Sequence, residues 1–215
     1  MTKSSRTQQV LNVYGIILII WSIYRWKVAM PAWIDEFLFK PLVFVLPIYW
    51  LIVHHEKKEF FNEIWLNSKK IVADCAVGLA LGGVFIISAL FAQYVKIGTI
   101  DLSVIGSQNI ALALLITLGT ATSEEILSRG FILKRFFEET NNPYLASFNA
   151  SILFLILHIP ILFTIPELKG TLLILILATD FILSLINCFI YIDRKSLITP
   201  ILIHAMYNAA VLLYI

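Results

Sequence analysis

Long apolar runs separated by short polar stretches dominate the chain. Seven of these runs are long enough to form membrane-spanning helices, at about residues 10–26, 37–53, 71–95, 108–137, 144–163, 171–192 and 197–215. A helical bilayer crossing needs roughly 20 apolar residues. Backbone in contact with lipid must satisfy its own hydrogen bonds, which a helix does. The pattern therefore predicts an all-α fold, a polytopic membrane helical bundle of about seven transmembrane helices.

The longest polar connection, residues 54–70, carries its own pattern. Phe60, Phe61, Ile64 and Trp65 recur at helical spacing between charged residues. Such spacing is typical of a short amphipathic helix that lies on the membrane surface. We expect this interfacial helix on the cytoplasmic face, with an ordinary loop as the alternative.

Composition agrees with a membrane protein of one domain. The chain has 215 residues, of which 60% are hydrophobic and 14% are charged, against a charged share of about 25% in globular proteins. No linker or internal repeat divides it, so residues 1–215 are expected to form a single transmembrane domain. The net charge of +2 gives no basis for a nucleic-acid partner. Cys75 and Cys188 lie within apolar runs and are expected to be buried free thiols.

The distribution of Lys and Arg predicts the orientation. With the N-terminus in the cytoplasm, ten of the Lys and Arg residues other than Arg129 fall on the cytoplasmic side and five, including Lys40, on the other. Cytoplasmic loops of membrane proteins carry the excess of positive charge. We therefore expect a cytoplasmic N-terminus, and so compact a chain fits the plasma membrane of a prokaryote.

The fourth span contains charges in an apolar setting. Its stretch "SEEILSRGF" places Glu124, Glu125 and Arg129 within the membrane. A charge at that depth costs about 2.5 to 3.5 kcal/mol and normally faces a bundle interior or a wet cavity. Glu125 and Arg129 are four residues apart and can pair, whereas Glu124 points about 100° away and has no evident partner. One interpretation is a structural ion pair, with Glu124 turned toward water; the other is a functional site.

Two later spans carry polar residues of the kind that catalysis uses. His158 follows Phe154 by one helical turn, and His204 and Asn208 share one helix face because they are four residues apart. A single histidine on an apolar helix usually has a structural role. Three polar patterns on three separate spans favour one shared site.

These patterns resemble those of the CPBP family, which comprises CAAX proteases and bacteriocin-processing (Abi) enzymes. Glu124, Glu125 and Arg129 match the family's EExxxR motif, Phe154 and His158 its FxxxH motif, and His204 and Asn208 its HxxxN motif. The resemblance covers residues 108–215, which would form the catalytic core.

The resemblance implies an intramembrane endopeptidase that cleaves a membrane-associated substrate, either a prenylated protein or a leader peptide. Glu124 would be the general base, His158 would hold the attacking water, and His204 and Asn208 would stabilise the oxyanion. Glu125, Arg129 and Phe154 would support these residues. The alternative is a non-catalytic protein, such as a bacteriocin immunity protein, that binds a peptide in the same polar cavity.

The sequence leaves open whether the site binds a metal and what role one further carboxylate has. No cofactor is expected, but Glu124, His158 and His204 could together bind Zn²⁺ in a catalytic site of the two-His, one-Glu type. The HExxH spacing typical of such sites is absent, so the metal-free mechanism is preferred. Asp180, an additional intramembrane carboxylate, is expected to be a solvated group near the outer interface, and the alternative is that it pairs with a motif residue or lines the cavity.

Overall fold

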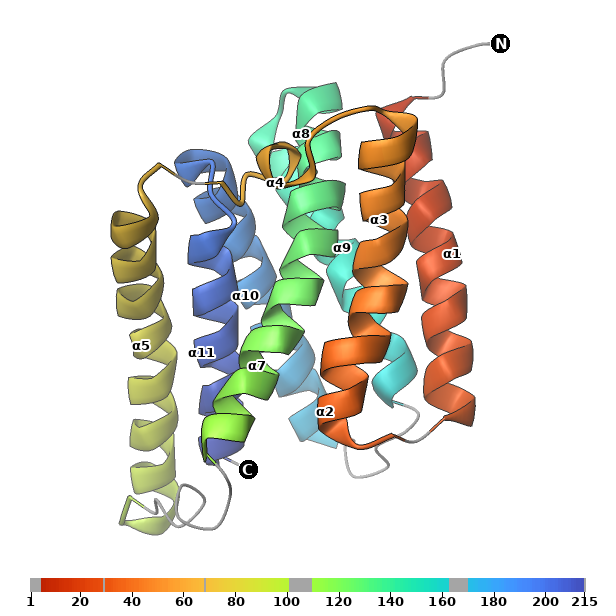
Figure 1. Cartoon of the computed structure of the whole chain (residues 1–215). Helices are drawn as coiled ribbons and strands as arrows, with labels where there is room; N and C mark the ends of the chain where they lie inside the picture. Colours follow the sequence, from red (N-terminus) through yellow and green to blue (C-terminus); the bar gives the residue numbers. More distant parts are fainter. Residues whose placement is uncertain (1–4, 29, 68, 101–109, 163–169, 215) are drawn as a thin grey trace.

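The computed structural model describes residues 5–28, 30–67, 69–100, 110–162 and 170–214, and within these ranges the regular structure is entirely helical (Figure 1). In chain order the elements are α1 (Arg6–Lys27), α2 (Ala32–Ile34), η1 (Asp35–Phe39), η2 (Pro41–Val45), α3 (Leu46–Trp50), η3 (Leu51–His55), α4 (Phe60–Glu63), α5 (Ile71–Ile97), α7 (Ile110–Glu125), η4 (Ile126–Leu133), α8 (Lys134–Thr140), α9 (Pro143–Leu162), α10 (Gly170–Arg194) and α11 (Ile198–Tyr214), where η marks π-helical turns.

Within the described ranges, six helices are long and apolar enough to cross a membrane. They comprise Arg6–Lys27, Ala32–His55, Ile71–Ile97, Ile110–Thr140, Pro143–Pro160 and Gly170–Arg194, and the shorter apolar helix Ile198–Leu213 completes the bundle. The predicted all-α membrane bundle is therefore confirmed. Residues 108, 109, 163 and 215, at the ends of predicted spans, lie outside the described residues. Cys75 and Cys188 are both free; Cys188 is buried as expected, whereas Cys75 is only partly buried, so the expectation of burial is wrong for Cys75.

Proline shapes the second span, which runs from α2 to η3 as one continuous helix. Pro41 and Pro47 lack a backbone N–H, so the regular ladder of hydrogen bonds cannot pass through them. The backbone N–H of Lys40 donates instead to the carbonyl of Asp35, five residues earlier, and that of Leu46 donates to Pro41 in the same way. These π-helical turns keep the helix continuous past the prolines.

The polar connection after this span contains the short helix α4. Glu59 caps it by accepting hydrogen bonds from the first N–H groups of the helix. Phe60 and Ile64 are buried in the protein core, and the Trp65 ring stacks on Tyr191 with the centroids 4.9 Å apart. The expected helix is thus present over four residues only, and most of its apolar face packs against the bundle.

Close packing against α5 sets the position of α11. Helices α5 and α11 lie side by side (Figure 1), with Gly78 and Gly82 at the contact. A Cβ atom added at Gly78 would lie 2.8 Å from the Cβ of Leu202, and one at Gly82 would lie 2.8 Å from the Cβ of Met206. Small residues one turn apart let two membrane helices approach in this way. The contact fixes the helix that carries His204 and Asn208.

The charged helix lies at the centre of the bundle. In Figure 1, α7 runs between α11 on one side and the helix of residues 32–55 on the other. All eight residues of η4, which continues α7, are buried. Glu124 and Glu125 are the last two residues of α7, at the start of this π-helical segment. The motif therefore begins where the helix changes its winding, a feature often found at functional sites.

Candidate active site

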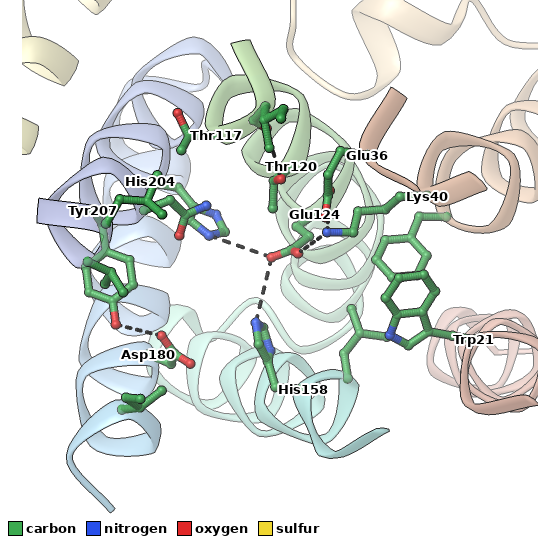
Figure 2. A pocket seen from close by; sticks show the side chains of 17 residues that line it. Trp21, Glu36, Lys40, Thr117, Thr120, Glu124, His158, Asp180, His204 and Tyr207 are labelled. Carbon is green, nitrogen blue, oxygen red and sulfur yellow. Dashed lines mark hydrogen bonds and ion pairs between the residues drawn. The ribbon is translucent and has the colours of Figure 1, made fainter. Parts of the chain in front are cut away.

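The three sequence motifs meet at one cavity. A cavity of about 320 Å³ is lined by Glu124 from α7, His158 from α9, and His204 and Asn208 from α11, among other residues. Figure 2 shows both imidazoles directed toward the Glu124 carboxylate. Residues more than 80 positions apart in the sequence therefore share one cavity inside the helical bundle.

One oxygen of Glu124 faces both histidines. Oε2 lies 3.8 Å from Nε2 of His158 and 3.6 Å from Nε2 of His204. These distances are too long for direct hydrogen bonds. Oε2 is buried and has no hydrogen-bond partner within the described part of the chain. A water about 2.8 Å from the carboxylate and from one imidazole would bridge such a gap.

The tautomers of the two histidines follow from their other contacts. Nδ1 of His158 lies 2.8 Å from the backbone carbonyl oxygen of Phe154, and Nδ1 of His204 lies 2.8 Å from Oε1 of Glu125. Carbonyl and carboxylate oxygens only accept, so each Nδ1 carries the hydrogen and donates it. Both rings therefore present Nε2 to the cavity.

A buried cluster around Glu125 holds His204 in place. Oε1 of Glu125 accepts hydrogen bonds from Arg129 Nη1 at 2.9 Å and from Asn187 Nδ2 at 3.1 Å, in addition to His204. Arg129 also donates to the backbone oxygen of Ser184 at 3.0 Å. The predicted pairing of Glu125 with Arg129 is thus confirmed, and the cluster joins α7, η4, α10 and α11.

Phe154 packs among the polar motif residues. Its ring centroid lies 4.6 Å from that of His158 and 5.8 Å from that of His204. The guanidinium carbon of Arg129 lies 4.8 Å from the same centroid. One buried aromatic ring therefore restricts the orientation of both imidazoles and stacks with the arginine.

Glu124 has a partner that the sequence did not reveal. Nζ of Lys40 lies 3.0 Å from Oε1 of Glu124 and 2.6 Å from Oε2 of Glu36, and Glu124 is only 6% exposed. The expectation that Glu124 has no partner is therefore wrong, and its carboxylate lies in the cavity. The charge count places Lys40 on the non-cytoplasmic side, whereas its ammonium lies beside Glu124 in the interior of the bundle. The Glu36–Lys40 spacing of four residues, next to an apolar run, was the available signal.

Asp180 also differs from its expected position. It is 7% exposed and lines the same cavity as Glu124. The hydroxyl of Tyr207 donates to its Oδ1 at 2.8 Å. The prediction of a solvated carboxylate near the outer interface is therefore wrong, because α10 turns this side chain toward the bundle interior.

The geometry of Glu124, His158 and His204 does not favour a metal ion. No group of three or more His, Cys, Asp or Glu within the described ranges is arranged to bind a metal ion. The Lys40 ammonium, 3.0 Å from Glu124, already supplies positive charge to the carboxylate. A dication beside this ammonium would meet like-charge repulsion. The donor set of Glu124, His158 and His204 therefore fits zinc poorly.

Comparison with known proteins places this site in a family. Residues 106–210 match the family model of type II CAAX prenyl endopeptidases, Rce1-like. No curated protein and no solved structure matched the chain. The matched region contains all seven motif residues, whereas Glu36 and Lys40 lie outside it. Residues 106–210 therefore match the Rce1-like family of CAAX-type membrane proteases, as the resemblance to CPBP enzymes predicted, and the chain is a multi-pass membrane protein.

Proposed function

We propose that this protein is an intramembrane endopeptidase that hydrolyses a peptide bond of a membrane-anchored substrate, such as a prenylated protein or a leader peptide. The observation that carries the proposal is the buried, unsatisfied oxygen of Glu124 facing two imidazole nitrogens. Peptide hydrolysis needs a base next to a water and donors next to the developing negative charge. The residues around this cavity supply both.

In the first step, a water held between Glu124 and His158 attacks the carbonyl carbon of the substrate. Glu124 Oε2 accepts a proton from this water as the new C–O bond forms, and His158 Nε2 accepts the second hydrogen in a hydrogen bond. The Phe154 carbonyl holds the His158 ring in the tautomer that leaves Nε2 free to accept. The tetrahedral intermediate then carries a negative charge on its oxygen.

His204 and Asn208 would stabilise that oxyanion. The Asn208 amide can donate directly. His204 can donate from Nε2 only when both of its nitrogens carry protons, and Glu125 on one side and Glu124 on the other supply balancing negative charge. Collapse of the intermediate breaks the C–N bond as Glu124 returns its proton to the leaving amine. The products are a carboxylic acid and an amine.

Lys40 has a supporting role in this mechanism. By binding Oε1 of Glu124, it leaves Oε2 as the oxygen that faces the water site. Its charge also favours the ionised carboxylate, which is the form that acts as a base. No step of the mechanism uses a metal ion.

The orientation expected from the sequence is kept as part of the proposal. With Lys40 in the cavity, four Lys or Arg residues instead of five count toward the non-cytoplasmic side, so the count still favours a cytoplasmic N-terminus. We propose this arrangement in the plasma membrane of a prokaryotic cell.

Replacement of the base tests the function. Purified protein in liposomes would be given a prenylated, internally quenched peptide, and the products would be identified by mass spectrometry. We expect Glu124→Gln to abolish cleavage, and Asp193→Asn, at an exposed position of α10, to leave it unchanged. Full activity of the Glu124→Gln protein would rule the mechanism out.

A second candidate function is a non-catalytic peptide-binding or immunity protein. One observation favours it: the ion pair of Lys40 with Glu124 is what a purely structural carboxylate would also form. This candidate predicts that the Glu124→Gln and His204→Ala proteins still protect cells against a bacteriocin. It also predicts that the unmodified protein releases no cleavage product. The endopeptidase predicts the opposite result in both assays.

A further inference from the structure

Asp180 differs from the other buried carboxylates in lacking a cationic partner. Four of the five buried Asp and Glu side chains in the described residues pair with Lys or Arg at 3.0 Å or less: Asp35 with Arg25, Asp74 with Arg194, Glu124 with Lys40, and Glu125 with Arg129. Asp180 forms no such ion pair within the described part of the chain. A buried charge without a partner is costly and, inside a membrane protein, usually functional.

The contacts of Asp180 orient it without neutralising it. The Tyr207 hydroxyl donates to Oδ1, and the hydroxyl of Thr179 lies 2.9 Å from the Tyr207 oxygen. Hydroxyl groups offer neutral hydrogen bonds and add no positive charge. The hydroxyl groups of Tyr207 and Thr179 therefore hold the Asp180 carboxylate in one position. Its negative charge is left to be balanced by another group.

The cavity around Asp180 has an excess of negative charge. Among the described residues, its lining includes the carboxylates of Glu36, Glu124 and Asp180 and one ammonium, that of Lys40. That ammonium already contacts both Glu36 and Glu124. In Figure 2, Asp180 lies across the opening from Lys40, with Glu124 and His158 between them. A cation that pairs with Asp180 would therefore lie beside the reacting groups without displacing Lys40.

We propose that Asp180 is a specificity-determining residue that binds a lysine or arginine side chain of the substrate close to the cleaved bond. This inference rests on the proposed endopeptidase function, because it names the chemical class of side chain that the cavity accepts. The long apolar stem of such a residue can pack along the apolar cavity wall while its charged end reaches the carboxylate. A substrate with a carboxylate at that position would be rejected by like-charge repulsion.

A charge-swap experiment tests the inference. Otherwise identical apolar peptides would carry a single Lys, norleucine or Glu at each position next to the cleaved bond, and kcat/KM would be measured in liposomes. We expect the unmodified protein to prefer Lys over norleucine at one position by roughly tenfold or more, as for a close charge pair. Asp180→Asn should remove the preference, and Asp180→Lys should transfer it to Glu. Asp193→Asn, on the same helix but exposed, should keep the original preference.

Binding measurements separate this inference from the proposed function. Affinities of the same fluorescent peptides would be measured on detergent-solubilised Glu124→Gln protein, with and without Asp180→Asn. A preference for Lys that depends on Asp180 supports the inference even if the Glu124→Gln protein still cleaves and the mechanism fails. Equal binding of Lys and norleucine peptides overturns it, as does a uniform loss of activity on all peptides in the Asp180→Asn protein. If the Asp180→Lys protein does not fold, Tyr207→Phe is the second variant to test. It keeps the carboxylate of Asp180 and should retain the preference for Lys.

Discussion

The ammonium nitrogen of Lys40 lies 3.0 Å from Oε1 of Glu124, and this ion pair joins the N-terminal half of the chain to the family-matched half. The two residues are 84 positions apart. Both are buried, and Glu36 holds the ammonium from its other side. The family-matched region thus receives the counter-ion of its central carboxylate from a helix outside that region.

Removal of this counter-ion should change the pH dependence of activity. Glu124 faces Lys40, His158 and His204, and Asp180 lines the same cavity. Lys40→Met leaves the carboxylate buried without its cation, which favours its neutral form. We expect activity near neutral pH to fall about tenfold or more and the acid limb of the pH–activity profile to move to higher pH.

The matched control removes another buried lysine. Lys134 pairs with Glu63 away from the cavity, so Lys134→Met should lower thermal stability and leave the position of the acid limb unchanged. Lys40→Arg keeps the charge and should retain part of the activity. An unshifted profile in the Lys40→Met protein would contradict the role of Lys40.

The cluster around Glu125 should matter for both stability and turnover. Glu125→Gln leaves the fully buried Arg129 without its ion-pair partner, which costs about 3 to 5 kcal/mol. It also weakens the acceptor that orients His204. We expect a lower unfolding temperature in detergent and a fall in kcat that exceeds any change in KM. A variant that retains kcat despite lower stability would show that His204 does not depend on Glu125 for its orientation.

Metal chelation should not affect the enzyme. The Lys40 ammonium already supplies positive charge at Glu124. We expect cleavage in liposomes to survive dialysis against EDTA and 1,10-phenanthroline, with zinc well below one ion per chain by elemental analysis. Loss of activity that added Zn²⁺ restores would instead support a metal site at Glu124, His158 and His204.

The contact between α5 and α11 should tolerate no side chain at Gly82. An alanine Cβ there would lie 2.8 Å from the Cβ of Met206, two residues from His204 in the sequence. Overpacking of this kind costs about 1 to 3 kcal/mol and would displace α11. We expect Gly82→Ala to lower both the unfolding temperature and the cleavage rate. Gly83→Ala, where no atom lies within 4 Å of the new Cβ, should change neither by much.

Glu63 should make stability depend on pH at the α4 end of the bundle. Burial raises the pKa of Glu63, but the hydrogen bond from Lys58 and the charge of Lys134 outweigh it, so the pKa lies below its ordinary value. Glu63 therefore adds stability above its unfolded pKa of about 4.3, and this contribution is lost as the pH falls through the lower folded pKa.

Thermal unfolding of the Glu63→Gln protein would check this direction of the pH dependence of stability. We expect the variant to unfold at a lower temperature than the unmodified protein at about pH 7, with the difference shrinking at about pH 3. The exposed Glu139, changed to Gln, is the control. A difference that grows on acidification would contradict the assignment.

The sequence by itself determined the helices and the pairs of residues that share one face of a helix. Apolar runs of bilayer length require helices, because lipid offers no hydrogen bonds to the backbone. The spacing of four residues placed Glu125 next to Arg129, and His204 and Asn208 on one face. These are local relationships, fixed by the winding of a single helix.

Only the tertiary structure decided which charges balance one another. Lys40 reaches Glu124 because the second span packs beside α7, and Asp180 enters the cavity because α10 turns that face inward. A linear pattern cannot give these pairings, since the rotation of each helix about its axis depends on all of its neighbours. Close contacts such as Gly82 against Met206 set that rotation, and they join parts of the chain more than 100 residues apart.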